Sequence, residues 1–232
     1  MLSLQSTMAT PLLVLGNKAY SSWSLRGWLA LKAAGCDFDE MIIPLRQDDT
    51  QVRILEHSPS AKVPALVLDE VVICESLAIC EWAAETYPSA NLWPEDPFER
   101  AVARSVASEM HAGFAAMRQA MPMSVFGCTK NFTPEGDVQT AIYRVVEIWN
   151  DCRRRFGAGG PWLFGSYSIA DIMYAPVAIR FATFGIDLDP VSAAWRDTML
   201  AHPHMRDWIA AGRRESWRLP DIDTLFDEPW EG

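Results

Sequence analysis

Three serine hydroxyls stand close together just before the first segment of helical composition. They are Ser21, Ser22 and Ser24, with Trp23 between them, and residues 25–34 follow as the expected helix. A hydroxyl at a helix N-terminus can cap the helix by accepting a backbone N–H. It can also donate a hydrogen bond to an anion that the helix end attracts. Taken alone, the motif leaves both interpretations open.

A second polar pair, Glu75 and Ser76, precedes another expected helix at residues 77–86. The free N–H groups of a helix start, with the Ser76 hydroxyl, can bind a carboxylate, while Glu75 offers an acceptor for an ammonium group. The pair could therefore recognise both charges of an amino-acid head group. Alternatively, Ser76 is a plain N-cap and Glu75 a favourable acid in the first turn.

The first serine cluster lies inside an expected βαβ unit. The apolar run 12–15 predicts a buried strand, residues 25–34 a helix that stops at Gly35, and residues 38–45 a second strand. A strand, a helix and a strand in immediate succession indicate a parallel pair with a right-handed crossover. This order brings the serines to the helix end that follows the first strand.

The second polar pair follows an expected hairpin. Runs 65–68 and 71–74 are apolar and are separated by two residues, which is the spacing of a two-residue hairpin. The helix at 77–86 comes next and ends before a proline. Residues 46–62 are polar and are expected to be irregular.

Residues 88–97 carry three prolines and predict a linker. Beyond it helical periodicity dominates, and no convincing strand is found. Ser168 and Asp171 form a capping box, so replacing Asp171 by alanine should cost about 1 kcal/mol or more of stability. The expected helices cover residues 98–121, 137–156, 169–184, 193–200 and 204–216. The predicted division is a flexible tail at 1–10, a first domain at 11–87, the linker at 88–97 and an all-helical domain at 98–232.

Composition excludes several classes of function. The chain has 232 residues, 50% of them hydrophobic, and a net charge of −10, which argues against nucleic acid as a partner. Its five cysteines are odd in number and lack Cys-x-x-Cys spacing, so a reducing compartment is expected. We find no signal peptide and no membrane-spanning run, which predicts a cytoplasmic protein, with Met8 as an alternative start to Met1. No histidine has neighbours at metal-ligand spacing, so no metal is expected.

Four motifs in this order carry a resemblance to the cytosolic glutathione transferases, over residues 12 to about 216. The first motif is similar to the Ser-Ser-Cys-x-x-Arg pattern of the zeta class, so a bacterial, zeta-like, serine-type member is implied. The expected fold is α/β plus all-α, with a thioredoxin-like βαβ-ββα domain followed by a helical bundle. The motifs are Ser21-Ser22-Trp23-Ser24 with Arg26, Lys62-Val63-Pro64-Ala65-Leu66, Glu75-Ser76, and Ser168 with Asp171.

The resemblance assigns Ser21 as the catalytic residue. Glutathione reacts as a thiolate, and a free thiol with a pKa near 8.5 is mostly protonated at neutral pH. Lowering that pKa by two units needs about 2.7 kcal/mol, which one charge-assisted hydrogen bond and a helix terminus can supply. Ser21 would act as a hydrogen-bond donor, and Ser22 as a cap or secondary ligand. Trp23 would be a further glutathione contact, at the position where the zeta class usually has cysteine.

The same resemblance assigns the rest of the glutathione site. It implies a cis bond between Val63 and Pro64, so that the backbone of Val63 pairs with the cysteinyl part of glutathione. Lys62 would reach the glycine carboxylate, and Glu75 and Ser76 would hold the γ-glutamyl head group. Alternatively, Pro64 is a trans proline that opens an edge strand, and Lys62 is a solvated loop residue.

The second substrate is expected between the domains, against the helix at 98–121. Arg104, His111 and Arg118 recur every seven residues and would share one stripe of that helix. Such a stripe is usually solvated or a dimer contact, but Arg118 in the site would favour acidic electrophiles. The apolar candidates for this site are Phe114, Met117, Met121 and Met123, although methionines at helical spacing more often form core.

The leading functional hypothesis is a glutathione transferase that conjugates its thiolate to small electrophiles, as in detoxification. One alternative is a glutathione-dependent cis-trans isomerase of the maleylacetoacetate type, which the departure from cysteine at Trp23 weakens. The other is a non-catalytic interaction scaffold of the same fold, since fold does not decide function. The resemblance also implies a homodimer.

Overall fold

The computed structural model describes residues 10–232, so the expected tail and the alternative start at Met8 fall outside the described residues, except for Thr10. Its main sheet has four strands in the order β2-β1-β3-β4. β1 pairs in parallel with β2, and the other two pairings are antiparallel. The strands are β1 (Leu12–Leu15), β2 (Asp39–Ile42), β3 (Ala65–Leu68) and β4 (Val71–Cys74). The predicted thioredoxin-like topology is confirmed.

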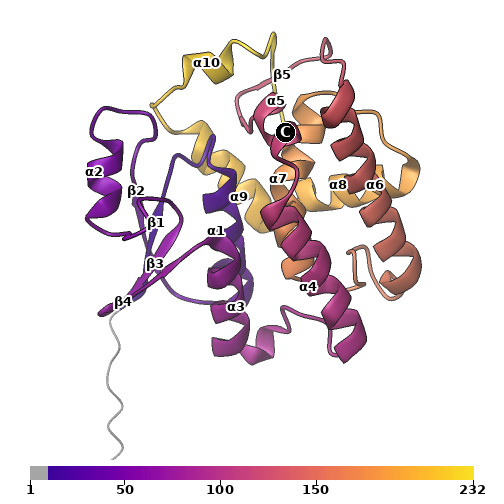
Figure 1. Ribbon diagram of the computed structural model, residues 1–232, viewed down its shortest axis with the longest axis horizontal. Coiled ribbons are helices and arrows are strands. Elements are labelled where there is room, and N and C mark those ends of the chain that lie inside the picture. The colour runs from indigo at the N-terminus through magenta and orange to yellow at the C-terminus, as the bar shows by residue number, and fades with distance from the viewer. Residues whose placement is uncertain (1–9) are drawn as a thin grey trace, which may run out of the picture.

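Helices cover both faces of this sheet (Figure 1). α1 (Ser22–Ala34) and α3 (Ser76–Thr86) pack on the face toward the rest of the chain. The short helix α2 (Thr50–Leu55) covers the other face, where Ile54 packs with Val14 of β1 and Ala65 of β3. We expected residues 46–62 to be irregular, and this prediction was wrong for the part that forms α2. Because Ile54 is the only buried residue of α2, the helix leaves no apolar periodicity in the sequence.

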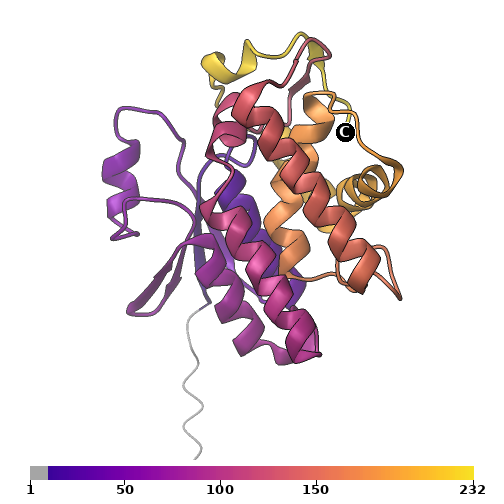
Figure 2. The ribbon, with the colours of Figure 1, turned by 45° about the vertical axis from the view of Figure 1, so that its right-hand side comes forward.

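The second half of the chain is a helical bundle, as predicted, and lies on the side of α1 and α3 away from the sheet (Figure 2). A 3₁₀ turn at Pro88–Ala90 leads into it. The domain boundaries at 87 and 98 stay predictions. The helices are α4 (Pro97–Ala112), α5 (Ala115–Ala120), α6 (Gly136–Phe156), α7 (Ile169–Thr183), α8 (Pro190–Ala201), α9 (Pro203–Arg213) and α10 (Pro220–Asp223).

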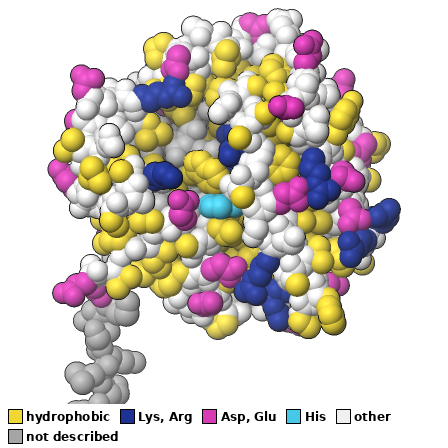
Figure 3. Space-filling model, viewed as in Figure 1, with side chains coloured by type: hydrophobic (Ala, Val, Ile, Leu, Met, Phe, Trp, Pro, Cys, Tyr) yellow, Lys and Arg dark blue, Asp and Glu magenta, His cyan; other side chains and the backbone are white. Residues whose placement is uncertain are grey.

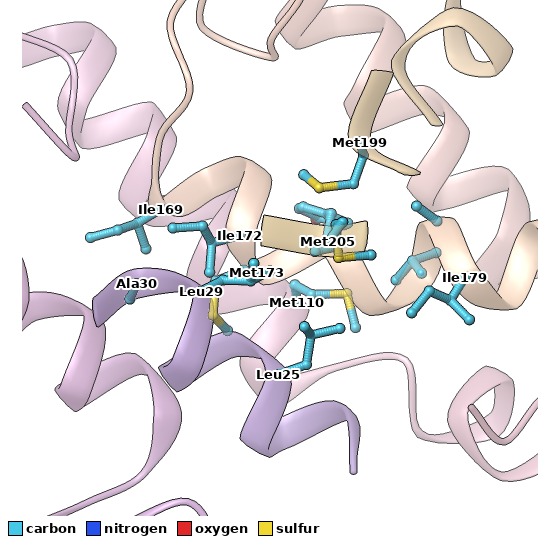
Figure 4. Close-up of a cluster of buried hydrophobic side chains, with 14 of the residues drawn as sticks. Leu25, Leu29, Ala30, Met110, Ile169, Ile172, Met173, Ile179, Met199 and Met205 are labelled. Atoms are coloured by element: carbon cyan, nitrogen blue, oxygen red, sulfur yellow. The ribbon is translucent and has the colours of Figure 1, made fainter. Parts of the chain in front are cut away.

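One continuous core joins the two halves. Figure 4 shows Leu25 and Leu29 of α1 facing Met110 of α4 and Met173 of α7, and all four side chains are buried. α7 is buried along almost its whole length, which explains its uniformly apolar sequence. The relative position of the sheet and the bundle is therefore fixed by close packing, so residues from both can form one site.

The expected helix at 98–121 is two helices. α4 ends at Ala112, and α5 begins after Phe114, whose φ of 60° places it in the left-handed region. Gly113 allows this break, because a Cβ there would lie 2.8 Å from the backbone oxygen of Glu109. The prediction of one shared stripe was therefore wrong: Arg104 and His111 lie on α4, and Arg118 lies on α5.

The C-terminal segment returns across the molecule. The two-residue strand β6 (Glu228–Pro229) pairs with β5 (Gly127–Cys128), so the expectation of no strands in this half was also wrong. Both strands are too short to leave an alternating pattern in the sequence. None of the helices at residues 10–232 is both long and apolar enough to cross a bilayer.

Glu215 holds the turn that precedes α1. Its carboxylate accepts hydrogen bonds from the backbone N–H of Lys18 at 2.8 Å and of Ala19 at 3.1 Å. Burial raises the pKa of Glu215, and these two bonds partly oppose that effect. Since Ser21 follows the turn directly, the C-terminal segment helps to set the start of α1.

Replacing Glu215 with alanine is expected to destabilise the fold by about 2–4 kcal/mol, because two backbone donors lose their partners. Glu215→Gln should lose less, since one amide oxygen can still accept. Thermal unfolding measures both, with the exposed Glu85→Ala as the control. A melting temperature of Glu215→Ala equal to that of Glu85→Ala would contradict the role.

Candidate functional site

Most of the predicted glutathione residues line one cavity. It has a volume of about 340 Å³ and lies where α1, β3 and α3 meet the end of α4. Figure 3 shows this face hollowed near its centre, with acidic, basic and histidine side chains around the hollow. The lining residues are Trp23, Lys62, Val63, Pro64, Glu75, Ser76, His111 and Ala112. Four segments that lie apart in the sequence thus line one cavity.

The start of α3 has an unusual backbone and an unpartnered hydroxyl within the described residues. Glu75 has a φ of 74°, a left-handed conformation that is strained for a residue with a Cβ and is typical of functional sites. Ser76 is 1% exposed, and its Oγ has no hydrogen-bond partner in the described chain. A buried hydroxyl without a partner is costly, so this one fits a ligand that would complete it. The bond between Val63 and Pro64 is cis, as predicted.

His111 contacts lining residues from two other elements of the cavity, α1 and α3. Its Nε2 lies 3.7 Å from the Glu75 carboxylate, and its ring meets the ring of Trp23 edge-on at 5.3 Å. Burial lowers the pKa of His111, and Arg26 and Arg118 lower it further, whereas Glu75 raises it. Together these effects favour the neutral form of the His111 ring, next to the acceptor predicted for the γ-glutamyl ammonium.

Ser21 is the N-cap of α1. Its Oγ accepts the Ser24 N–H at 3.3 Å and donates to Ser24 Oγ at 2.8 Å. Ser24 Oγ in turn accepts the backbone N–H of Gly16 at 3.0 Å. Both serines are buried, so these bonds tie the helix start to the end of β1. This is the capping role that the sequence left open for these serines.

Ser22 faces the helical bundle. Its Oγ accepts a hydrogen bond from Arg180 Nη2 of α7 at 3.2 Å, and its backbone carbonyl accepts one from Arg26 Nη1 at 3.1 Å. Within residues 10–232 nothing accepts the hydrogen of its hydroxyl. Two guanidinium groups thus meet at the first residue of α1.

Arg26 and Arg180 are buried charges that form no salt bridge within residues 10–232. Both are almost inaccessible to solvent, and each binds a backbone carbonyl through Nε, Arg26 that of Met173 and Arg180 that of Met121. Each also has one terminal nitrogen with no partner in the described chain. Burial lowers the pKa of Arg180 to about 9, and repulsion from Arg118 adds to this effect. Burial also lowers the pKa of Arg26, and repulsion from Arg180 and Arg118 lowers it further.

Arg118 completes this group, which we call the arginine cluster: Arg26, Arg118 and Arg180. The guanidinium carbons of Arg26 and Arg118 lie 4.5 Å and 5.4 Å from the ring centre of Trp23, which also lines the cavity. Arg118 binds the carbonyl of Gly113, and burial lowers its pKa. No carboxylate at residues 10–232 forms a salt bridge with any of the three. The cluster is therefore suited to an anion.

The other residues predicted for the second substrate are more scattered. Arg104 is paired with Glu81 at 3.2 Å on the surface. Met117 and Met121 are fully buried in the core, which agrees with the alternative interpretation, and Phe114 is half-buried at the start of α5. Contact of these side chains with a substrate stays a prediction.

Arg180 was missed from the sequence, although a signal existed. It is the only charged residue between Asp171 and Asp187, inside a helix that is otherwise apolar. A charge in such a helix is rarely buried unless it is paired or functional. In the part of the chain that the structure describes, no three histidine, cysteine or acidic side chains come together as metal ligands.

Comparisons with known proteins agree with this geometry. Residues 20–86 match the family described as the N-terminal domain of glutathione S-transferase, and residues 99–211 match its C-terminal domain. The chain is 31% identical to a probable maleylacetoacetate isomerase of Caenorhabditis elegans, over 73% of this chain and 78% of the relative. It is 30% identical to the maleylacetoacetate isomerase of Mus musculus, over 78% and 82%.

The fold is also that of solved structures in the same family. A glutathione transferase homologue from Burkholderia, solved with bound glutathione, superposes with a TM-score of 0.66 at 22% identity, over 88% of this chain and 98% of that one. With these matches to both halves of the chain, the protein belongs to the glutathione S-transferase family of enzymes, as a zeta-like member.

Proposed function

We propose that this protein holds glutathione as a thiolate at the N-terminus of α1 and transfers it to small electrophiles that carry a carboxylate. The cavity supports the first half of the proposal, because it is lined by Lys62, Val63, Glu75, Ser76 and Trp23, which would surround the tripeptide. The activating hydroxyl would come from this helix start, where the resemblance assigns Ser21. A net charge of −10 repels an anionic ligand, so local devices must bind it.

The observation that carries the acceptor class is the arginine cluster. Two buried guanidinium groups, each with a nitrogen that has no partner and neither in a salt bridge within the described residues, are costly to fold. A carboxylate on the second substrate would supply the missing charge through strong, charge-assisted hydrogen bonds. In the conjugation, the thiolate sulfur forms a C–S bond with the electrophilic carbon. Either a leaving group departs with its electron pair, or an activated double bond takes the pair and a proton from solvent.

Isomerisation of an unsaturated diacid is a second candidate, because the relatives at 31% and 30% identity are named maleylacetoacetate isomerases. The thiolate would add to the cis double bond, the resulting single bond would rotate, and elimination would return the thiolate, with no net change in atoms. Turnover of a maleyl-type diacid tests this version. If the protein conjugates glutathione to electrophiles but does not isomerise the diacid, only the first candidate remains.

Retention on immobilised glutathione and turnover of a carboxylate-bearing electrophile test the proposal. We expect retention of wild type, weaker retention of Ser76→Ala, and a lower rate for Ser21→Ala with glutathione still bound. No retention of wild type at millimolar ligand would favour the scaffold alternative. Equal rates in wild type and Ser21→Ala would contradict the predicted role of Ser21.

We also propose a cytoplasmic homodimer that acts in detoxification. All five cysteines are free thiols in the structure, which suits a reducing compartment. Large apolar side chains are exposed on two helices of the bundle, Phe98 on α4 and Tyr143 on α6, and would be covered by a second copy. The molar mass in solution measures the oligomeric state.

A further inference from the structure

His111 lies opposite the acid that is predicted to hold the ammonium of glutathione. Both His111 and Glu75 line the cavity, and His111 Nε2 lies 3.7 Å from the Glu75 carboxylate. Half of the Glu75 side chain is exposed, so a positive group that enters the cavity can reach it. Two cations can therefore pair with this carboxylate: a protonated His111 or the ammonium of the ligand.

The second nitrogen of the His111 ring opposes protonation. His111 Nδ1 is buried and has no hydrogen-bond partner within residues 10–232. A neutral imidazole can leave this nitrogen without a hydrogen, whereas the charged ring must carry an N–H there. A buried donor without an acceptor is costly, so the charged form of the ring depends on its interaction with Glu75.

The other charges around the ring are positive. Burial lowers the pKa of His111, and the Glu75 carboxylate raises it. Arg26 of α1 and Arg118 of α5 lower this pKa further, and Lys62 brings one more cation to the lining of the same cavity. An ammonium that pairs with Glu75 would neutralise the charge that favours protonation and add a positive charge beside the ring. Protonated His111 and a bound ammonium are therefore mutually unfavourable.

The carboxylate of the same head group has donors elsewhere. Ser76 is buried at the first turn of α3, and its Oγ has no partner in the described chain. The free N–H groups of this helix start also attract an anion. The head-group carboxylate therefore does not need a charge from His111, and the ammonium decides how binding and protonation affect each other.

We infer that Glu75 and His111 form one site for a single positive charge, so that glutathione expels a proton from His111 when it binds at mildly acidic pH. The inference rests on the proposed function. His111 touches no reacting atom, but it makes the affinity for the γ-glutamyl ammonium depend on pH. In the exchange the imidazolium loses its proton to solvent, the ammonium keeps its three hydrogens, and no covalent bond of the tripeptide changes.

The experiment is isothermal titration calorimetry with S-methylglutathione, which keeps the γ-glutamyl head group but has no thiol to titrate. In wild type we expect the dissociation constant to rise about 2- to 10-fold between pH 7 and pH 5.5, since release of one proton changes affinity about tenfold per pH unit. Titrations at pH 6 in buffers of different ionisation enthalpy count the protons. We expect release of a fraction of one proton per ligand.

Two variants assign the proton to this pair. His111→Gln keeps a polar side chain that takes no proton, so its affinity should stay constant over the same range, with no proton released. Glu75→Gln should bind more weakly at pH 7 and also lose the pH dependence, because the ring then lacks the anion that favours its charged form. His57→Gln is the matched control, because His57 does not line the cavity, and it should titrate like wild type.

Failure of wild type to bind S-methylglutathione at millimolar concentration would overturn the proposed glutathione site together with this inference. An affinity that does not change between pH 7 and pH 5.5, or that changes equally in wild type and His111→Gln, would overturn the inference alone. Tighter binding at pH 5.5 would also overturn it, because protonated His111 would then serve the carboxylate of the head group.

Discussion

Replacing Asp171 with alanine is expected to destabilise the protein by about 3–5 kcal/mol. The fully buried carboxylate accepts four hydrogen bonds, from the Leu163 N–H, the Ser168 N–H and hydroxyl, and Trp195 Nε1, at 2.8–3.0 Å. Alanine would leave these buried donors without a partner, and each costs about 1–3 kcal/mol before relaxation. Because Trp195 belongs to α8, the predicted capping box also fastens two helices together.

Chemical denaturation measures the effect, with the exposed Asp187→Ala as the control. Trp195→Phe keeps the ring and removes one donor, so it should cost about 1 kcal/mol. A loss in the free energy of unfolding for Asp171→Ala that is no larger than the loss for Asp187→Ala would contradict the prediction.

The same carboxylate should make stability depend on pH. Burial raises the pKa of Asp171 to about 6, outweighing four hydrogen bonds that favour the ionised form. The folded chain therefore holds an extra proton between about pH 4 and pH 6 relative to the unfolded chain. The contribution of Asp171 to the free energy of unfolding therefore falls as pH rises through that window. Asp171→Asn should remove this part of the pH dependence, which denaturation at several pH values measures.

Local signals in the sequence predicted the elements that line the cavity. Gly35 ends α1 with a φ of 70°, as expected of a helix C-cap, and Ser76 begins α3. The cavity then follows from topology, since β3 brings Lys62 and Val63 alongside both helix N-termini. Each helix end depends on residues close in sequence, which is why local signals predicted these elements.

The arginine cluster depends on contacts that no local pattern contains. Arg180 reaches Ser22 across 158 positions, and only the packing of α7 on α1 brings them together. The break at Gly113 was missed for a similar reason. Apolar periodicity continues through it, while the close approach of the Glu109 carbonyl that demands glycine is visible only in three dimensions. The arginine cluster was therefore less predictable from the sequence than the elements that line the cavity.

Arg118→Met is expected to lower kcat/KM for a carboxylate-bearing acceptor about 10- to 100-fold, because a charge-assisted hydrogen bond in a partly buried site contributes about 1.5–3 kcal/mol. Arg118 is the most accessible member of the arginine cluster, and it lies 5.4 Å from the ring of Trp23 at the cavity. For a neutral acceptor of similar size the change should stay within about twofold, since a neutral group gains little from the cation. The ratio of the two kcat/KM values is the measurement.

Arg104→Met is the matched control, because Arg104 is a surface arginine seven residues before His111, is paired with Glu81, and faces no part of the cavity. It should leave kcat/KM unchanged for both acceptors. If Arg118→Met lowers kcat/KM for both acceptors, the role of Arg118 is only to hold the Gly113 carbonyl and the start of α5. A fall in kcat/KM for the carboxylate-bearing acceptor alone would instead mean that the arginine cluster, although costly to bury, is retained because the acceptor carries the opposite charge.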